Sequence, residues 1–283
     1  VGYAGQFGWR FGLASTWVGL GNAFIGSLLP WAILGRRTRV MTQHLNSRTM
    51  PDFFGLRFLS PGLKTVAALI VFVFLIPYTA SLFNGLSRLF TMAFPQIDYA
   101  WCVIVMAVLT GVYVIIGGYM ATAINDFIQG VIMIVGIVAV IAAVLHGQGG
   151  FSEAIARLSQ VPAAPAGGTQ QLGAFTSFFG ADPLFLLFVV ILTSLGTWGL
   201  PQMVGKFYAI KNEDSIRKGT VISTVFAIIV AGGSYFLGGF GRLFAESVSY
   251  QADGVTPVYD SIIPAMLSGL APVLIGVVLV LVL

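Results

Sequence analysis

Long apolar stretches that carry almost no charge dominate this chain. From Val131 to Leu145, for example, no acidic or basic residue occurs. Charged residues make up 8% of the chain, whereas about 25% is usual in a soluble domain. Such a chain cannot cover its surface with polar groups, so we expect an integral membrane protein. The alternating ten-residue pattern of a membrane β-barrel is absent, which predicts an all-α bundle.

The apolar stretches predict six complete spans and a seventh that begins at Leu274. The complete spans cover residues 11–34, 63–93, 99–117, 119–146, 183–207 and 219–240. Ten of the 14 Lys and Arg residues lie in or beside two connections, residues 35–61 and 206–218. The positive-inside rule therefore places these two connections in the cytoplasm, and the charges do not indicate a nucleic-acid surface.

The sequence offers little for enzyme chemistry. Cys102 is the only cysteine and lies in an apolar run. His44 and His146 have no partner at ligand spacing, and no phosphate-binding loop or Ser/His/Asp constellation is visible. We therefore predict a protein that is not an enzyme and has no cofactor.

Asp126 is the only acidic residue embedded in what looks like a spanning segment. Thr122, Asn125, Asp126 and Gln129 follow the spacing i, i+3, i+4 and i+7, so they share one helix face. A carboxylate is costly in lipid and should face protein, water or an ion. We interpret this face as a cation-binding site or exit path. The alternatives are a helix-end aspartate solvated from the cytoplasm, or one that pins neighbouring helices.

Two further segments carry candidate solute-binding residues. The span 63–93 contains Pro77, which should kink it, followed by Tyr78. Ser81, Asn84 and Arg88 share a face of the same span. The alternative for this face is a polar seam between helices.

The span 183–207 is interrupted by glycine and proline. Irregular backbone at membrane depth is tolerated where it is buried in protein or lines a cavity, so we predict a broken helix at a solute site. A simple kink at Pro201 is the alternative. The candidate residues here are Thr193, Ser194, Thr197, Trp198 and Gln202.

Short helices are expected outside the spans, beginning near Met50, from Phe151 to Leu158, and from about Val258 to Leu270. The chain begins without Met and stops inside an apolar run. We expect it to be a piece of a longer protein.

Three ordered motifs carry a family resemblance. Residues 113–121 (YVIIGGYMA) resemble the signature of the sodium:solute symporters, with Tyr119 where Leu, Met or Phe is usual. Residues 36–40 with 49–58 are similar to the cytoplasmic loop of sodium/proline symporters. Residues 206–211 (KFYAIK) resemble the loop after their broken helix.

This resemblance implies a leucine-transporter-type bundle of two inverted five-helix repeats, here incomplete. Residues 1–146 would hold core helices one (its tail) to five, residues 147–182 an extracellular loop with a short helix, and residues 183–283 core helices six to eight (partial). The main sodium site of the family uses the first and the end of the eighth core helix, and both regions are absent here. Asp126 matches the family's aspartate on the fifth core helix, which is implicated in a second sodium site or the exit path.

The resemblance leaves the solute open. Tyr78 resembles a substrate-site tyrosine of proline symporters, yet their tryptophan on the broken helix corresponds to Thr193. Sugar symporters carry an Asn and a gating Tyr where this chain has Ser194 and Thr197.

We therefore predict a sodium-coupled symporter that carries a small polar organic solute, an amino acid or a carboxylate, by alternating access. It would be a multi-pass protein of the cell membrane, by expectation a bacterial inner membrane, with sodium, the solute and the lipid bilayer as partners and no nucleic acid. The alternatives are a transporter-like sensor module fused to a signalling domain, and a membrane enzyme. The solute, sodium against proton coupling, stoichiometry and oligomeric state stay open.

Overall fold

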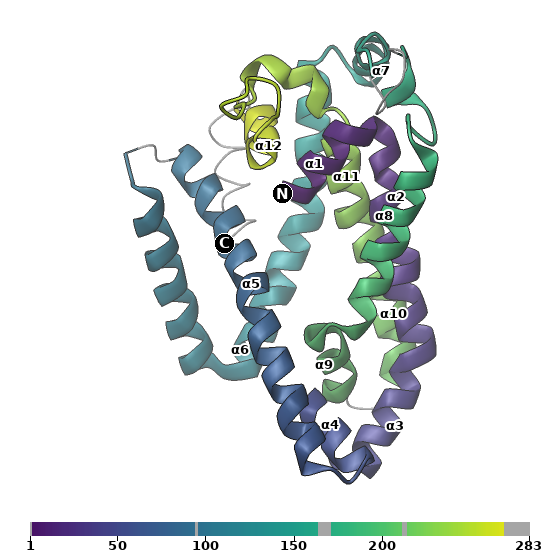
Figure 1. Ribbon diagram of the computed structural model, residues 1–283, viewed down its shortest axis with the longest axis vertical. Helices are drawn as coiled ribbons and strands as arrows, with labels where there is room; N and C mark the ends of the chain where they lie inside the picture. The colour runs from purple at the N-terminus through teal and green to yellow at the C-terminus, as the bar shows by residue number, and fades with distance from the viewer. Residues whose placement is uncertain (1, 94–95, 164–170, 211–213, 269–283) are drawn as a thin grey trace. The chain divides into compact units, whose positions relative to one another are not determined.

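The computed structural model describes residues 2–93, 96–163, 171–210 and 214–268, which are mainly helical (Figure 1). The helices in these ranges are α1 (Gly2–Phe11), α2 (Thr16–Ala23), α3 (Arg36–His44), α4 (Met50–Arg57), α5 (Pro61–Ala93), α6 (Tyr99–Gly147), α7 (Phe151–Ser159), α8 (Pro183–Gly196), α9 (Pro201–Ala209), α10 (Asp214–Ala227), α11 (Gly233–Gly238) and α12 (Tyr259–Leu267). Between them, π-helical turns occupy Phe24–Leu28, Trp31–Gly35 and Ile228–Gly232. The only β-pairing within the described ranges is two isolated bridges. The predicted span from Leu274 lies outside the described residues.

Five helical stretches of the described residues are long and apolar enough to cross a membrane, and the bent pair α8 and α9 makes a sixth. Each overlaps one of the six predicted spans, although the first stretch begins and ends about ten residues beyond the predicted span and the second ends at Gly85 instead of residue 93. The side chains of α5 support a lipid environment, since Phe72 and Phe74 are 67% and 69% exposed. The prediction of an all-α membrane protein is confirmed, while the inverted repeat stays a prediction.

The first helical stretch, Gly2–His44, has 43 residues. At 1.5 Å per residue it would measure roughly 65 Å, about twice the thickness of the hydrocarbon layer. Gly12 divides it, because its φ of +61° ends α1. Residues 2–11 thus form a separate helix, α1.

The chain divides into two compact units, which we describe separately. The first contains residues 1–16, 81–186 and 232–283, and the second contains residues 17–80 and 187–231. In the first unit α1 packs against α11 and α12. Gly8 and Gly238 make this possible, since a Cβ on Gly8 would clash with the carbonyl of Gly238.

The core of the first unit is apolar and aromatic. Phe240, Leu158 and Ile262 are fully buried in it. Arg242 closes it at one side by donating from Nε to the carbonyl of Trp9 at 2.9 Å, with its guanidinium 4.4 Å from the Trp9 ring centroid.

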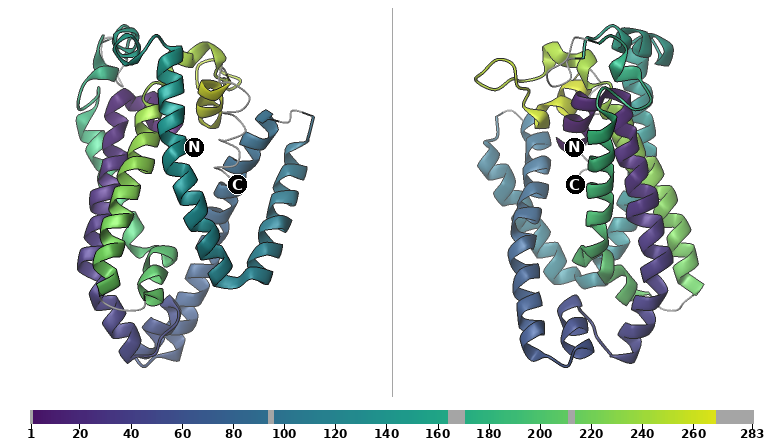
Figure 2. Two further views of the ribbon diagram at one scale, coloured as in Figure 1. Left: turned by 180° about the vertical axis from the view of Figure 1, so that it is seen from behind. Right: turned by 45° about the vertical axis from the view of Figure 1, so that its right-hand side comes forward.

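In the second unit α10 runs beside residues 24–35 (Figure 2). A hydrogen bond of 2.8 Å joins Ser27 Oγ to Ser223 Oγ across this contact. A small core of Trp31, Met203, Phe207 and Ile216 ties α9 and α10 to the same segment. Arg39 of α3 adds a bond of 2.7 Å from Nη1 to the carbonyl of Tyr208 on α9.

The predicted spans 99–117 and 119–146 meet at a sharp break within α6. Gly118 has a φ of 59° and a ψ of −163°, which only glycine adopts readily. Figure 1 shows the two halves of α6 meeting at this bend. Pro77, by contrast, lies inside α5, which continues through it.

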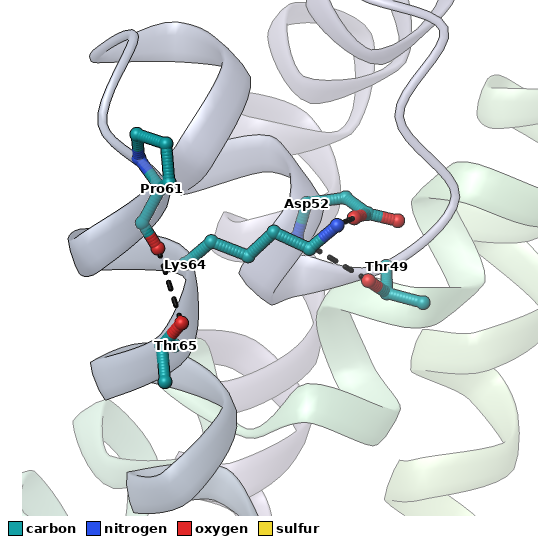
Figure 3. A network of polar contacts seen from close by, with 5 residues as sticks. All are labelled: Thr49, Asp52, Pro61, Lys64 and Thr65. Atoms are coloured by element: carbon teal, nitrogen blue, oxygen red, sulfur yellow. Dashed lines mark hydrogen bonds and ion pairs between the residues drawn. The ribbon is translucent and has the colours of Figure 1, made fainter.

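The short helices expected near residues 50, 151 and 258 are present as α4, α7 and α12. Thr49 caps α4 by accepting from the amide of Asp52 at 3.3 Å. Asp52 in turn pairs with Lys64 Nζ of α5 at 2.6 Å (Figure 3). This hydrogen-bonded ion pair holds the pKa of Asp52 below its ordinary value.

Candidate functional site

Asp126 lies on the second half of α6 and is exposed, while Thr122, Asn125 and Gln129 are half-buried. Asp126 makes no ion pair or hydrogen bond with another described residue. The alternative in which it pins a neighbouring helix through a basic side chain therefore finds no support in the described ranges. A cation role for this face stays a prediction.

Thr122 already has a structural bond. Its hydroxyl donates to the carbonyl of Gly118 at 2.9 Å, four residues earlier. The break at Gly118 disturbs the regular helical bonds, and the hydroxyl satisfies one of the carbonyls there. Thr122 would thus act on an ion through its oxygen lone pairs, with its proton engaged.

The candidate residues on α5 are placed differently from one another. Tyr78 is 41% exposed and belongs to the second unit. Ser81 and Asn84 belong to the first, where Asn84 Oδ1 accepts from the hydroxyl of Tyr99 at 2.8 Å. This bond fits the polar seam that was the alternative interpretation for Asn84.

The interruption of the span 183–207 is real. The pair α8 and α9 is bent by 47°. A short 3-10 turn, Thr197–Gly199, follows α8, and Leu200 is extended before Pro201 starts α9. Pro at the first helical position suits a new helix, because its missing N–H would have no intrahelical partner there. The site is a broken helix rather than a kink.

Two side chains of the break bind the backbone of the facing helix. Trp198 donates from Nε1 to the carbonyl of Ile25 at 2.7 Å. Thr197 donates from its hydroxyl to the carbonyl of Gly26 at 3.0 Å and also lies 2.8 Å from the carbonyl of Ser194. These contacts fix the break against residues 24–28.

Pro30 explains why these carbonyls accept side-chain bonds. In a helix the carbonyl of Gly26 would accept from the N–H of residue 30, and proline has none. The π-turn Phe24–Leu28 directs the amide of Leu29 to Phe24, so the carbonyl of Ile25 would also have to use residue 30. At the change from the π-pattern to the α-pattern both carbonyls would share the amide of residue 30, and the proline removes it, so Trp198 and Thr197 supply the donors instead.

Buried polar atoms without a partner lie beside this contact. Ser194 is fully buried, and neither its Oγ nor Oδ1 of Asn22 has a hydrogen-bond partner among the described residues. A Cβ on Gly21 would lie 3.0 Å from Ser194 Oγ, and one on Gly26 would lie 3.3 Å from Asn22 Oδ1. Buried polar groups are normally satisfied, so these two oxygen atoms, which we call the polar subsite, are available to a water, an ion or a solute group.

The remaining two candidates on the broken helix are placed differently. Thr193 donates back to the carbonyl of Val189 at 2.8 Å, and Gln202 is exposed on α9. Of the five candidates, the structure brings Ser194, Thr197 and Trp198 together. The sequence did not identify Asn22 as a candidate, nor the role of Pro30. The missing N–H of Pro30 could have indicated that carbonyls one turn earlier have no helical donor.

Residue types that hold transition metals are not clustered in the described ranges, where no group of three His, Cys, Asp or Glu residues meets. The oxygen atoms of the subsite and the carboxylate of Asp126 are hard ligands of the kind that alkali cations use.

Comparisons with known proteins agree with the sequence motifs. The model of the sodium:solute symporter family matches residues 1–283. The sodium/proline symporter of Salmonella typhimurium is 29% identical over 238 residues, which cover 81% of this chain and 44% of the relative. The sodium/pantothenate symporter of Escherichia coli is 26% identical over 262 residues, 91% of this chain and 50% of the relative. A sodium/proline symporter of Staphylococcus aureus is 32% identical over 213 residues, 73% of this chain and 38% of the relative.

The chain spans about half the length of these relatives. They are bacterial sodium symporters by name, which agrees with the predicted membrane location and with the prediction of a transport protein rather than an enzyme. With the family model covering every residue, the resemblance drawn from the three motifs is confirmed: this chain belongs to the sodium:solute symporter family.

Proposed function

We propose that the protein carrying this chain is a sodium-coupled symporter of a small organic solute with a carboxylate group. The observation that carries the proposal is the broken helix α8–α9 with its buried polar subsite, in a chain that the symporter family model covers throughout. Proline and pantothenate, the solutes in the names of its relatives, both contain a carboxylate, which supports this class of solute. The sensor module gains no support from the comparisons.

The proposed mechanism is alternating access around the broken helix. Leu200 is the extended residue between α8 and α9, and a Cβ added to Gly196 or Gly199 beside it would meet no neighbouring segment within 4 Å. Rotation there would move α9 while Trp198 holds the break on residues 24–28. Sodium and solute need only bind one of the two states better than the other for their transport to be coupled.

Within this mechanism we assign solute contact to Ser194 and Asn22. Their oxygen atoms are buried without partners, so a bound polar group would relieve the cost of leaving them unsatisfied. Asp126 would serve the cation, and Tyr78 the solute, as the family resemblance implies. Gln202, Thr193, Ser81 and Asn84 remain candidates for polar contacts along the path.

Uptake by the intact protein in proteoliposomes tests the proposal. We expect radiolabelled proline or pantothenate to accumulate when an inward sodium gradient is imposed, and accumulation to stop when a sodium ionophore collapses it. Accumulation that follows a proton gradient instead would refute sodium coupling. Ser194→Ala should lower the apparent affinity for the solute, whereas Ser159→Ala on the outer helix α7 is the matched control and should leave it unchanged.

A further inference from the structure

A groove opens between residues 31–36 and the first two turns of α10, within the second unit. Its volume is about 350 Å³. Two close approaches frame it: Gly35 faces Ile216, and Gly219 faces the ring of Trp31. The two helical segments therefore run antiparallel along the groove.

The groove is polar at one end and apolar at the other. Arg36 lies four residues nearer the basic loops than Ala32, and Arg217 lies four residues nearer them than Val221. Four residues of helix correspond to about 6 Å. Both arginines are exposed at the loop end, and both apolar residues are exposed one turn deeper. The positive-inside rule puts the basic end at the cytoplasmic surface of the membrane.

Trp31 supplies a second, independent feature of the lining. It is 6% exposed, and its indole nitrogen is buried without an acceptor among the described residues. The ring is fixed, since it stands edge-on to Phe207 with 5.1 Å between ring centroids. A buried N–H donor without an acceptor among the described residues is uncommon in proteins.

We propose that this groove binds one phospholipid with an anionic headgroup, whose phosphate lies between Arg36 and Arg217 and whose acyl chain follows Ala32 and Val221. Guanidinium groups recognise phosphate through paired charge-assisted hydrogen bonds. Basic pockets between spanning helices at the cytoplasmic side suit acidic headgroups. Free phosphate is also an anion that guanidinium groups bind, but it has no apolar part to occupy the other half of the groove, so the lipid is the better match.

The test is lipid binding to the intact protein, measured by native mass spectrometry and by the shift of its melting temperature in detergent. The probes are phosphatidylglycerol and phosphatidylcholine with identical acyl chains, and inorganic phosphate. Arg36→Gln with Arg217→Gln should weaken phosphatidylglycerol binding at least about tenfold. The matched control is Arg37→Gln with Lys218→Gln, which removes two neighbouring positive charges that do not line the groove; it should retain most of the binding.

A third variant, Ala32→Phe, narrows the apolar half of the groove without changing its charge. It should also weaken binding of phosphatidylglycerol, while its binding of inorganic phosphate should be unchanged. Equal losses in both charge variants would mean general attraction to anionic lipid and would overturn the proposal. So would inorganic phosphate that binds as tightly as the lipid, equal binding of phosphatidylcholine, or unchanged lipid binding in Ala32→Phe. A dimer that persists without lipid and dissociates in Ala32→Phe would replace the lipid by a second copy.

Discussion

Removing the indole N–H of Trp198 tests whether Pro30 sets the position of the broken helix. In the structure Nε1 of Trp198 donates to the carbonyl of Ile25 at 2.7 Å. The variant Trp198→Phe keeps an aromatic ring and removes this donor. The carbonyl of Ile25 then has no intrahelical amide to turn to, because residue 30 is proline and the amide of Leu29 is bonded to Phe24.

The expected loss of stability follows from the unsatisfied carbonyl of Ile25. A hydrogen bond contributes about 1 kcal/mol net, and leaving a buried acceptor unsatisfied costs about 1–3 kcal/mol. We therefore expect Trp198→Phe to lower the free energy of unfolding by about 2 kcal/mol, including the smaller ring area. Unfolding of the intact protein by sodium dodecyl sulfate in mixed micelles, followed by circular dichroism, measures this difference.

The second step is a double-mutant cycle with Pro30→Ala. Replacing Pro30 by alanine restores an intrahelical donor for Ile25 in either helical pattern. If the segment becomes α-helical, the amide of Leu29 reaches Ile25; if the π-turn persists, the amide of residue 30 does so. In this background Trp198→Phe should cost only its ring area, so the two substitutions should couple by about 1 kcal/mol.

The same double-mutant cycle can also refute the role of Pro30. A coupling energy within about 0.3 kcal/mol of zero would mean that Pro30 does not create the need for the Trp198 bond. Thr197→Val provides a parallel variant, since its hydroxyl donates to Gly26, the other carbonyl that Pro30 leaves open. A change in uptake rate without a change in stability would instead assign Trp198 directly to the solute.

Three further predictions concern charged and aromatic side chains. Asp126→Asn should raise the sodium concentration for half-maximal uptake about tenfold, a change of about 1.4 kcal/mol in cation binding; it should shift the unfolding free energy by less than about 0.5 kcal/mol, as expected for an exposed residue. Unchanged sodium activation would count against the cation role. Tyr78→Ala should raise the apparent substrate constant about tenfold while sodium activation is retained, and an unaltered constant would remove Tyr78 from the solute path. The pKa of Asp52 is lowered mainly by its hydrogen bond to Lys64. The pair therefore stabilises the folded state at every pH above the unfolded pKa near 3.8. This stabilisation is lost as the pH falls through the lower pKa of the folded state. Both side chains are partly exposed, so Asp52→Asn should cost about 0.5 kcal/mol at pH 7 and nothing below the folded pKa; a difference independent of pH would contradict this.

The spans could be predicted from the sequence because they depend on length and the absence of charge alone. A run such as 131–145 needs no partner to be recognised as a membrane segment. The break at Gly118 and the interruption before Pro201 are also local, since they follow from glycine and proline backbone preferences. The continuity of α5 through Pro77 is not local in this way, because the surroundings of a proline decide whether the helix bends there.

The contacts of the candidate site could be predicted only in part. The sequence identifies Ser194, Thr197 and Trp198 as polar residues at a break, and Pro30 as a residue without an amide hydrogen. It does not say that the break faces residues 24–28, because that contact joins positions some 170 residues apart. It therefore cannot separate donors that hold the backbone, such as Thr197, from atoms that stay open to a ligand, such as Ser194 Oγ.

The basic residues show the same distinction between a pattern and its contacts. Their number on one side of the membrane sets orientation, and any positive charge would serve that purpose. Yet Arg39 donates to the carbonyl of Tyr208 at 2.7 Å, and Lys64 pairs with Asp52, whereas Arg36 and Arg217 line the groove beside α10. Exchanging Arg36, Arg39 and Arg217 for lysine would preserve orientation, but a lysine cannot reproduce the forked geometry of a guanidinium. Orientation and local contacts are therefore separable properties of the same charges, and only the second depends on the fold.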